Sequence, residues 1–123
     1  MKSSLRLLLA VSFGLALAGL ARAGDISGKW QSEFDSQIGV QKYTYDFHVD
    51  GTTVTGKAIN EHGEAAIQDG KIDGDTITFV EIFSFNGMDI KITYTGKING
   101  DEIKFTRQVG DFATEELTAK RVK

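Results

Sequence analysis

The chain has 123 residues, contains no cysteine, and carries 17 acidic against 14 basic residues, a formal net charge of −3. The absence of cysteine excludes disulfides, thiol catalysis and cysteine-based zinc sites. The acidic excess disfavours nucleic acid and anionic membranes as partners, and the length suits one domain with one core.

Residues 1–23 have the pattern of a secretory signal peptide. A basic start precedes an apolar run over 7–20, and the triplet Ala21-Arg22-Ala23 is typical of a cleavage site. We expect this segment to be removed, which leaves a single secreted or periplasmic domain, 24–123, with no membrane insertion after cleavage. The segment contains three of the basic residues, so the mature chain has a net charge of −6. An uncleaved N-terminal anchor is the alternative.

From residue 26 onward, apolar and polar residues alternate with the period of two that is typical of β-strands. Short turns rich in glycine, asparagine and aspartate separate the alternating segments, which indicates successive β-hairpins. The sequence therefore predicts an all-β fold, an eight-stranded antiparallel up-and-down (meander) barrel. Its strands are expected over 26–35, 40–49, 53–60, 64–72, 75–84, 88–98, 102–109 and 113–122. In the fourth strand Gln68-Asp69-Gly70 breaks the alternation, which predicts a β-bulge.

Two kinds of turn distinguish the two ends of this barrel. Tight Asp-Gly or Asn-Gly turns recur at 50–51, 73–74 and 99–100, and they alternate along the chain with more varied connections at 36–39, 60–63, 86–87 and 110–111. Because successive hairpin turns lie at opposite ends of a barrel, the tight turns share one end, the closed end. There Trp30 and Arg121 are expected to stack as a plug. The varied connections form the open end, where a ligand site is expected.

Three charged residues, Glu81, Arg107 and Glu115, fall on predicted inward faces in the open half of their strands. Because an isolated buried charge is very costly, we expect them to lie near one another, with Arg107 holding a carboxylate. Inward-facing tyrosines and one asparagine are expected to supply hydrogen bonds. The candidate ligand-binding residues are therefore Tyr43, Tyr45, Asn60, Glu81, Tyr94, Arg107 and Glu115. A satisfied ion pair with no ligand is the alternative.

The open-end loop 60–64 contains His62 between two glutamates, and this histidine is a further candidate acid, base or metal ligand. One histidine with loop carboxylates is a weak metal pattern, so no metal is expected. The candidate catalytic residues are Glu81, Glu115 and His62. Three apolar residues at the same end either pack inward or form a rim or lid for a ligand: Phe83, Phe85 and Met88.

The Gly28-x-Trp30 opening, the eight-strand meander and Arg121 in the closing strand resemble the calycin superfamily, which includes lipocalins, fatty-acid-binding proteins and avidins. The resemblance spans the mature chain, whose length fits avidins better than typical lipocalins, and it implies a barrel that holds small apolar or amphipathic molecules. Avidins surround biotin with several tryptophans, whereas this chain has only Trp30.

Three functions remain open from the sequence. The favoured one is binding of a small, partly polar ligand, anionic or carbonyl-bearing, with its polar group fixed by Arg107 and the tyrosines. The second is a cofactor-independent lyase, isomerase or hydrolase in which a buried carboxylate acts with Arg107. Both require a cavity lined by Tyr43, Glu81, Arg107 and Glu115, and a carboxylate left unpaired beside it would favour catalysis. The third is an envelope interaction module with a filled interior.

No cofactor is expected, because the chain has no phosphate loop, dinucleotide fingerprint or nucleophile elbow. The expected partner is a small molecule and not nucleic acid, and the sequence does not indicate an oligomeric state.

Overall fold

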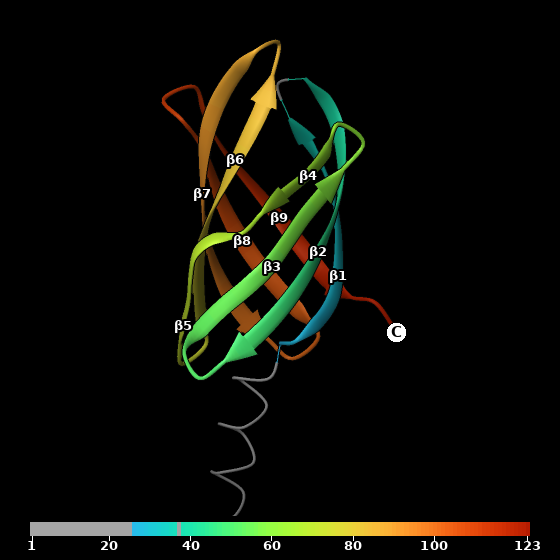
Figure 1. Ribbon diagram of the computed structural model, residues 1–123. Helices are drawn as coiled ribbons and strands as arrows, with labels where there is room; N and C mark the ends of the chain where they lie inside the picture. The colour runs from blue at the N-terminus through green and yellow to red at the C-terminus, as the bar shows by residue number, and fades with distance from the viewer. Residues whose placement is uncertain (1–25, 37) are drawn as a thin grey trace, which may run out of the picture.

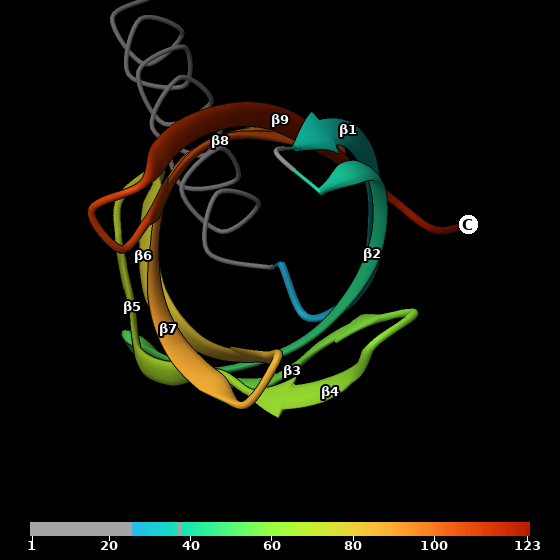
Figure 2. The same ribbon diagram turned by 90° about the horizontal axis from the view of Figure 1, so that it is seen from above.

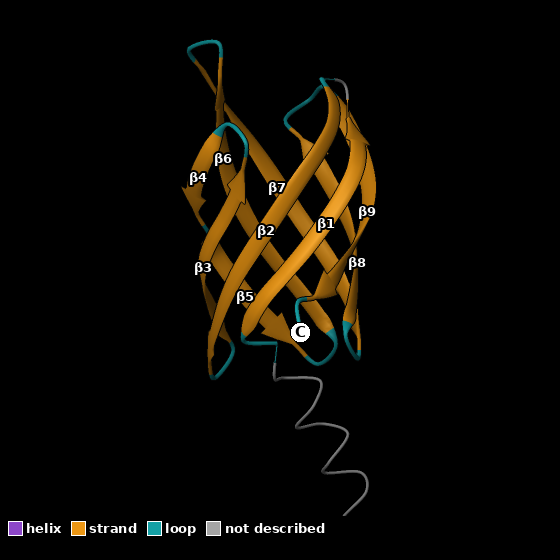
Figure 3. Ribbon diagram, turned by 90° about the vertical axis from the view of Figure 1, so that its right-hand side faces the viewer, coloured by secondary structure: helices purple, strands orange, loops and turns teal. Residues whose placement is uncertain are grey.

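A computed structural model describes residues 26–36 and 38–123, apart from the side chain of Phe85, and the predicted signal peptide lies outside these residues. The described residues form strands and short connections, without a helix (Figure 3). Within these ranges there is accordingly no helix with the length and hydropathy that a membrane crossing requires. The strands are β1 (Gly28–Ser36), β2 (Gly39–Asp50), β3 (Thr53–Asn60), β4 (Gly63–Ala66), β5 (Gln68–Asp73), β6 (Thr76–Phe85), β7 (Met88–Asn99), β8 (Glu102–Val109) and β9 (Ala113–Arg121).

The strands form one antiparallel sheet that closes on itself. Its order is β2-β1-β9-β8-β7-β6-β5-β3-β4, and the additional pairing of β2 with β3 completes the ring (Figures 1 and 2). Strands β4 and β5 are two halves of the predicted strand 64–72, and both pair with β3. The predicted eight-stranded up-and-down barrel is therefore confirmed.

The break between β4 and β5 changes the barrel wall. The register of β5 against β6 shifts between Gln68 and Lys71, and Asp69 has a φ of 53°, so the predicted bulge is confirmed. Before the bulge, β4 pairs with β3 alone. A narrow cleft of about 90 Å³ therefore opens through the wall between β4 and β6.

The closed end is plugged by the first and last strands. Trp30 is fully buried, and its indole N–H donates a hydrogen bond of 2.9 Å to the carbonyl of Ile26. The guanidinium of Arg121 lies 4.6 Å from the Trp30 ring centre, and its Nε donates to Asp101 Oδ1 at 3.0 Å. The expected stack is thus confirmed. It lies where the barrel closes, because Trp30 is paired with Arg121 in the ladder between β1 and β9.

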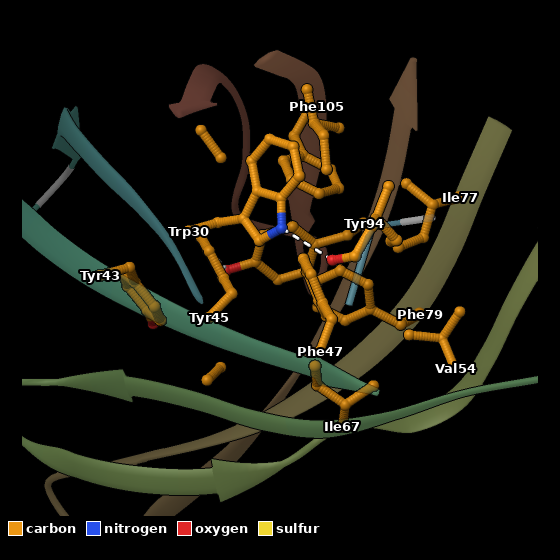
Figure 4. Packing of buried hydrophobic residues seen from close by; sticks show 14 of the residues in the cluster. Trp30, Tyr43, Tyr45, Phe47, Val54, Ile67, Ile77, Phe79, Tyr94 and Phe105 are labelled. Carbon is orange, nitrogen blue, oxygen red and sulfur yellow. Dashed lines mark hydrogen bonds between the residues drawn. The ribbon is translucent and has the colours of Figure 1, made fainter. Parts of the chain in front are cut away.

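Aromatic rings fill the barrel above this plug. Figure 4 shows the labelled rings of the core gathered around Trp30. Phe79 and Tyr94 stack at 4.3 Å between ring centres, and both contact Phe105 edge-on. Such pairs add about 0.5–1.5 kcal/mol each to the burial of their area. The closed end and the middle of the barrel are therefore filled by packed side chains.

Candidate ligand-binding site at the open end

The structure brings together the three charged residues that alternation places inside the barrel. Arg107 on β8 is directly opposite Glu115 on β9 and opposite Tyr94 on β7 in the strand register. Glu81 reaches the same region from β6 and is joined to it by hydrogen bonds. Glu81 and Arg107 are 2% and 3% exposed, so both are buried ionisable groups that need partners.

A directional hydrogen-bond network supplies those partners. Arg107 Nη2 donates to the hydroxyl of Tyr43 at 3.3 Å, and Tyr43 donates to Glu81 Oε2 at 2.8 Å. From the other side Tyr45 donates to the hydroxyl of Tyr94 at 3.2 Å, and Tyr94 donates to Glu81 Oε1 at 2.9 Å. Both oxygens of Glu81 therefore accept a hydrogen bond, an arrangement that suits a carboxylate.

Arg107 is held by rings as well as by charge. Its guanidinium carbon lies 5.0 Å from the ring centres of Phe34 and Tyr43 and 5.6 Å from that of Tyr94. Desolvated contacts of this kind are worth about 2 kcal/mol. Its Nε is 3.5 Å from Glu115 Oε1, close enough for an ion pair although the two groups are not aligned for a hydrogen bond.

Burial controls the protonation of the network. Desolvation raises the pKa of Glu81 above its ordinary value, and the hydrogen bond from Tyr43, the charge of Arg107 and the bond from Tyr94 oppose this rise. Burial also raises the pKa of all three tyrosines well above the ordinary value. The tyrosine hydroxyls therefore stay protonated near neutral pH and act as donors.

The raised pKa of Glu81 gives an expected pH dependence. The folded state binds the Glu81 proton more tightly than the unfolded state does, so the wild type loses stability relative to Glu81→Gln as pH rises through the folded-state pKa. Below about pH 4.5, the pKa of Glu81 in the unfolded state, the bound proton makes its full contribution to the stability of the wild type relative to Glu81→Gln. Urea denaturation of both proteins from pH 4 to pH 8 measures it. Glu33→Gln, on the exposed face of β1, is the matched control, and a difference between wild type and Glu81→Gln that does not vary with pH would contradict the assignment.

A cavity of about 180 Å³ lies in the open mouth above this network. Its polar side is formed by Gln41, Arg107 and Glu115. The rest is mainly apolar, and two of its apolar residues, Ile38 and Phe112, are 46% and 62% exposed at the rim. The complete lining is Ser36, Ile38, Gln41, Phe83, Ile90, Arg107, Val109, Phe112, Ala113 and Glu115.

The expected cavity lined by four named residues is not found in that form. Of these residues only Arg107 and Glu115 line the mouth cavity. Glu81 lines the wall cleft between β4 and β6 instead, and Tyr43 is buried and lines neither of these two cavities. The physical reason is that Arg107, stacked on aromatic rings, occupies the interior between the other three side chains.

Other predicted residues lie outside the network. Asn60 lines the wall cleft, and its Oδ1 accepts a 2.8 Å hydrogen bond from the backbone N–H of His62, so it stabilises its own turn. The His62 ring packs edge-on against Phe83 at 5.7 Å between ring centres, beside the same cleft. Met88 is 54% exposed at the hairpin tip, and the Phe85 side chain lies outside the described part of the structure. No cluster of potential metal ligands occurs among the described residues.

Gln41 is the functional candidate that the sequence analysis missed. It is 3% exposed and lines the mouth cavity together with Arg107. The signal was present, because Gln41 shares the inward parity of Tyr43 and Tyr45 on β2.

Comparison with known proteins bears on the fold alone. No family model matches the chain, and no curated protein matches it. Among solved structures, a mutant of the fluorescent protein UnaG matches with a TM-score of 0.50 and 13% sequence identity, over 80% of this chain and 96% of that one. The chain has a calycin-like fold. The predicted resemblance in architecture is thereby confirmed.

Proposed function

We propose that the protein is a secreted or periplasmic barrel that binds a small, partly polar ligand at its open end. Arg107 holds the polar group of the ligand, and its apolar part lies in the mouth cavity. The signal-peptide pattern of residues 1–23 supports the location. The observation that carries the binding proposal is the coincidence of the apolar cavity with buried polar atoms that have no partner.

Five buried polar side-chain atoms have no hydrogen-bond partner among the described residues, and four of them belong to residues that line this cavity. These four are Gln41 Oε1, Arg107 Nε and Nη1, and Glu115 Oε1. Arg107 Nε and Glu115 Oε1 face each other in the ion pair, whereas Gln41 Oε1 and Arg107 Nη1 have no partner, and an atom of that kind costs about 1–3 kcal/mol when it is left unpaired. A ligand head group in the cavity would recover that cost, since anionic and carbonyl groups both offer the acceptor that Arg107 requires.

The arrangement favours binding over catalysis. Both oxygens of Glu81 accept hydrogen bonds from tyrosines, and this carboxylate does not line the mouth cavity. Glu115 faces the cavity but forms an ion pair with Arg107. His62, the third catalytic candidate, lies beside the wall cleft. No candidate base therefore stands free beside the cavity, as acid–base catalysis there would require.

Filling the cavity tests the proposal. Ala113 lines the cavity at the start of β9, so Ala113→Trp is expected to place a large ring in it. With octan-1-ol as a neutral amphipathic probe, calorimetry is expected to show saturable binding to the wild type and at least about a tenfold loss of affinity in Ala113→Trp, equivalent to about 1.4 kcal/mol. Ala66→Trp, on an exposed position of β4, is the matched control and is expected to bind as the wild type does.

Two results would contradict the proposal. One is the absence of saturable octan-1-ol binding to the wild type. The other is equal binding to the wild type and to folded Ala113→Trp, which would place the probe elsewhere on the barrel.

A further inference from the structure

We propose that the ligand of the mouth cavity is uncharged and has a head group that both donates and accepts hydrogen bonds, as a primary or secondary amide does. This inference rests on the proposed function and decides between the two head-group classes, anionic and carbonyl-bearing, that Arg107 alone would admit. It is carried by the charge count of the buried cluster and by the types of atom that face the cavity.

The charges argue against an anionic ligand. Arg107 is the single buried cation among the described residues, and it already faces Glu115 at 3.5 Å and is linked through Tyr43 to Glu81. With both glutamates ionised the cluster has a net charge of −1, and with Glu81 protonated it is neutral. In either state a ligand carboxylate would add a buried negative charge that no remaining cation compensates.

The unpaired atoms specify the hydrogen bonds. Arg107 Nη1, which has no partner, can only donate, so the ligand needs an acceptor such as a carbonyl oxygen. Gln41 Oε1 can only accept, so the ligand also needs an N–H or O–H group. A carboxylate offers no donor and an ammonium offers no acceptor, whereas an amide offers both.

The cavity size limits the ligand to a small molecule. A cavity of about 150 Å³ holds benzene, and the mouth cavity measures about 180 Å³. The enclosed part of the ligand is therefore little larger than six non-hydrogen atoms. Ile38 and Phe112 extend apolar surface to the rim, where a longer tail would lie.

Three six-carbon probes of nearly equal size, which differ in their head group, allow the affinities for an amide, a carboxylate and an ammonium to be compared. Hexanamide, hexanoate and hexylammonium are titrated into the wild-type protein at pH 7, with binding followed by NMR chemical shifts up to millimolar concentration. We expect hexanamide to bind at least about tenfold more tightly than hexanoate and more tightly than hexylammonium.

A variant that weakens the preference for hexanamide over hexanoate tests the charge argument more directly. Glu115→Gln removes one negative charge from the cluster, so its hexanoate affinity is expected to rise and the preference for the amide to fall at least about tenfold. Glu116→Gln, the exposed neighbour on the same strand, is expected to leave the preference unchanged. Gln41→Leu changes no charge and is expected to weaken hexanamide while leaving hexanoate unaffected. It provides a second readout should Glu115→Gln fail to fold.

The possible outcomes distinguish a failure of this inference from a failure of the proposed function. If hexanoate or hexylammonium binds most tightly in the mouth cavity, the uncharged-ligand inference is overturned and the proposed function stands. If octan-1-ol shows no saturable binding to the wild type, the proposed function itself fails. If Glu115→Gln is folded and its preference equals that of the wild type, the charge argument is wrong.

Discussion

Replacing Arg107 with methionine is expected to destabilise the barrel by about 3–5 kcal/mol. The arginine is buried at 3% exposure beside two carboxylates, and methionine would leave Glu81 and Glu115 inside the barrel without a cation. The hydroxyl of Tyr43 would also lose the hydrogen bond that it accepts from Arg107. The cost should shrink as the pH falls, because burial raises the pKa of Glu81 and its protonation removes one of the charges left behind.

Urea denaturation of the wild type and Arg107→Met at pH 7 and pH 5 measures this effect. The control is Lys104→Met, three positions earlier on the outer face of β8, where a change within about 0.5 kcal/mol is expected. The double variant Arg107→Met with Glu115→Gln should recover part of the loss. A loss below about 1 kcal/mol, or one that is the same at both pH values, would show that the charges of the cluster are not buried as described.

Replacing Trp30 with alanine is expected to cost about 3–5 kcal/mol, the usual range for a buried tryptophan. The ring is fully buried and lies under the guanidinium of Arg121, where β1 meets β9. The ladder between these two strands has two paired positions, Trp30 with Arg121 and Gln31 with Lys120, so Trp30 occupies one of them. Thermal unfolding followed by circular dichroism measures the loss.

Trp30→Phe separates the plug from the ligand site. It keeps a ring beneath Arg121 but loses the N–H donor to Ile26, so an intermediate loss of stability is expected. Because the mouth cavity lies at the opposite end of the barrel, octan-1-ol should bind this variant with an unchanged affinity. Equal stability of Trp30→Ala and the wild type would mean that the plug is not required for closure.

The sequence predicted the barrel and its inward faces well because β-strands alternate strictly. Alternation needs only the local pattern of each strand, and it placed Glu81, Arg107 and Glu115 inside without knowledge of their neighbours. The tight turns could also be predicted from the sequence, because repeated Asp-Gly and Asn-Gly pairs favour tight hairpins. The bulge at 68–70 was visible for the same reason, as a break in the alternation.

The details of the site depend on relations between strands, which alternation does not provide. The registers of β8 against β7 and β9 place Arg107 opposite Tyr94 and Glu115, and Tyr43 reaches Glu81 from β2. Loop residues such as Ile38 and Phe112 have no alternating face, so their place in the cavity lining could not be read from the pattern. Asn60 had the right parity, but its side chain bonds within its own turn.

The barrel has a plug at one end and the proposed ligand site at the other. The most direct test is an amide chemical-shift map of the wild type during titration with octan-1-ol. We expect saturable shifts concentrated at 38–41, 107–109 and 112–115, with the Trp30 indole and the turn at 99–102 unaffected. Saturable shifts confined to the wall cleft at 60–65 or to the closed end would contradict the central claim, as would the absence of saturable shifts.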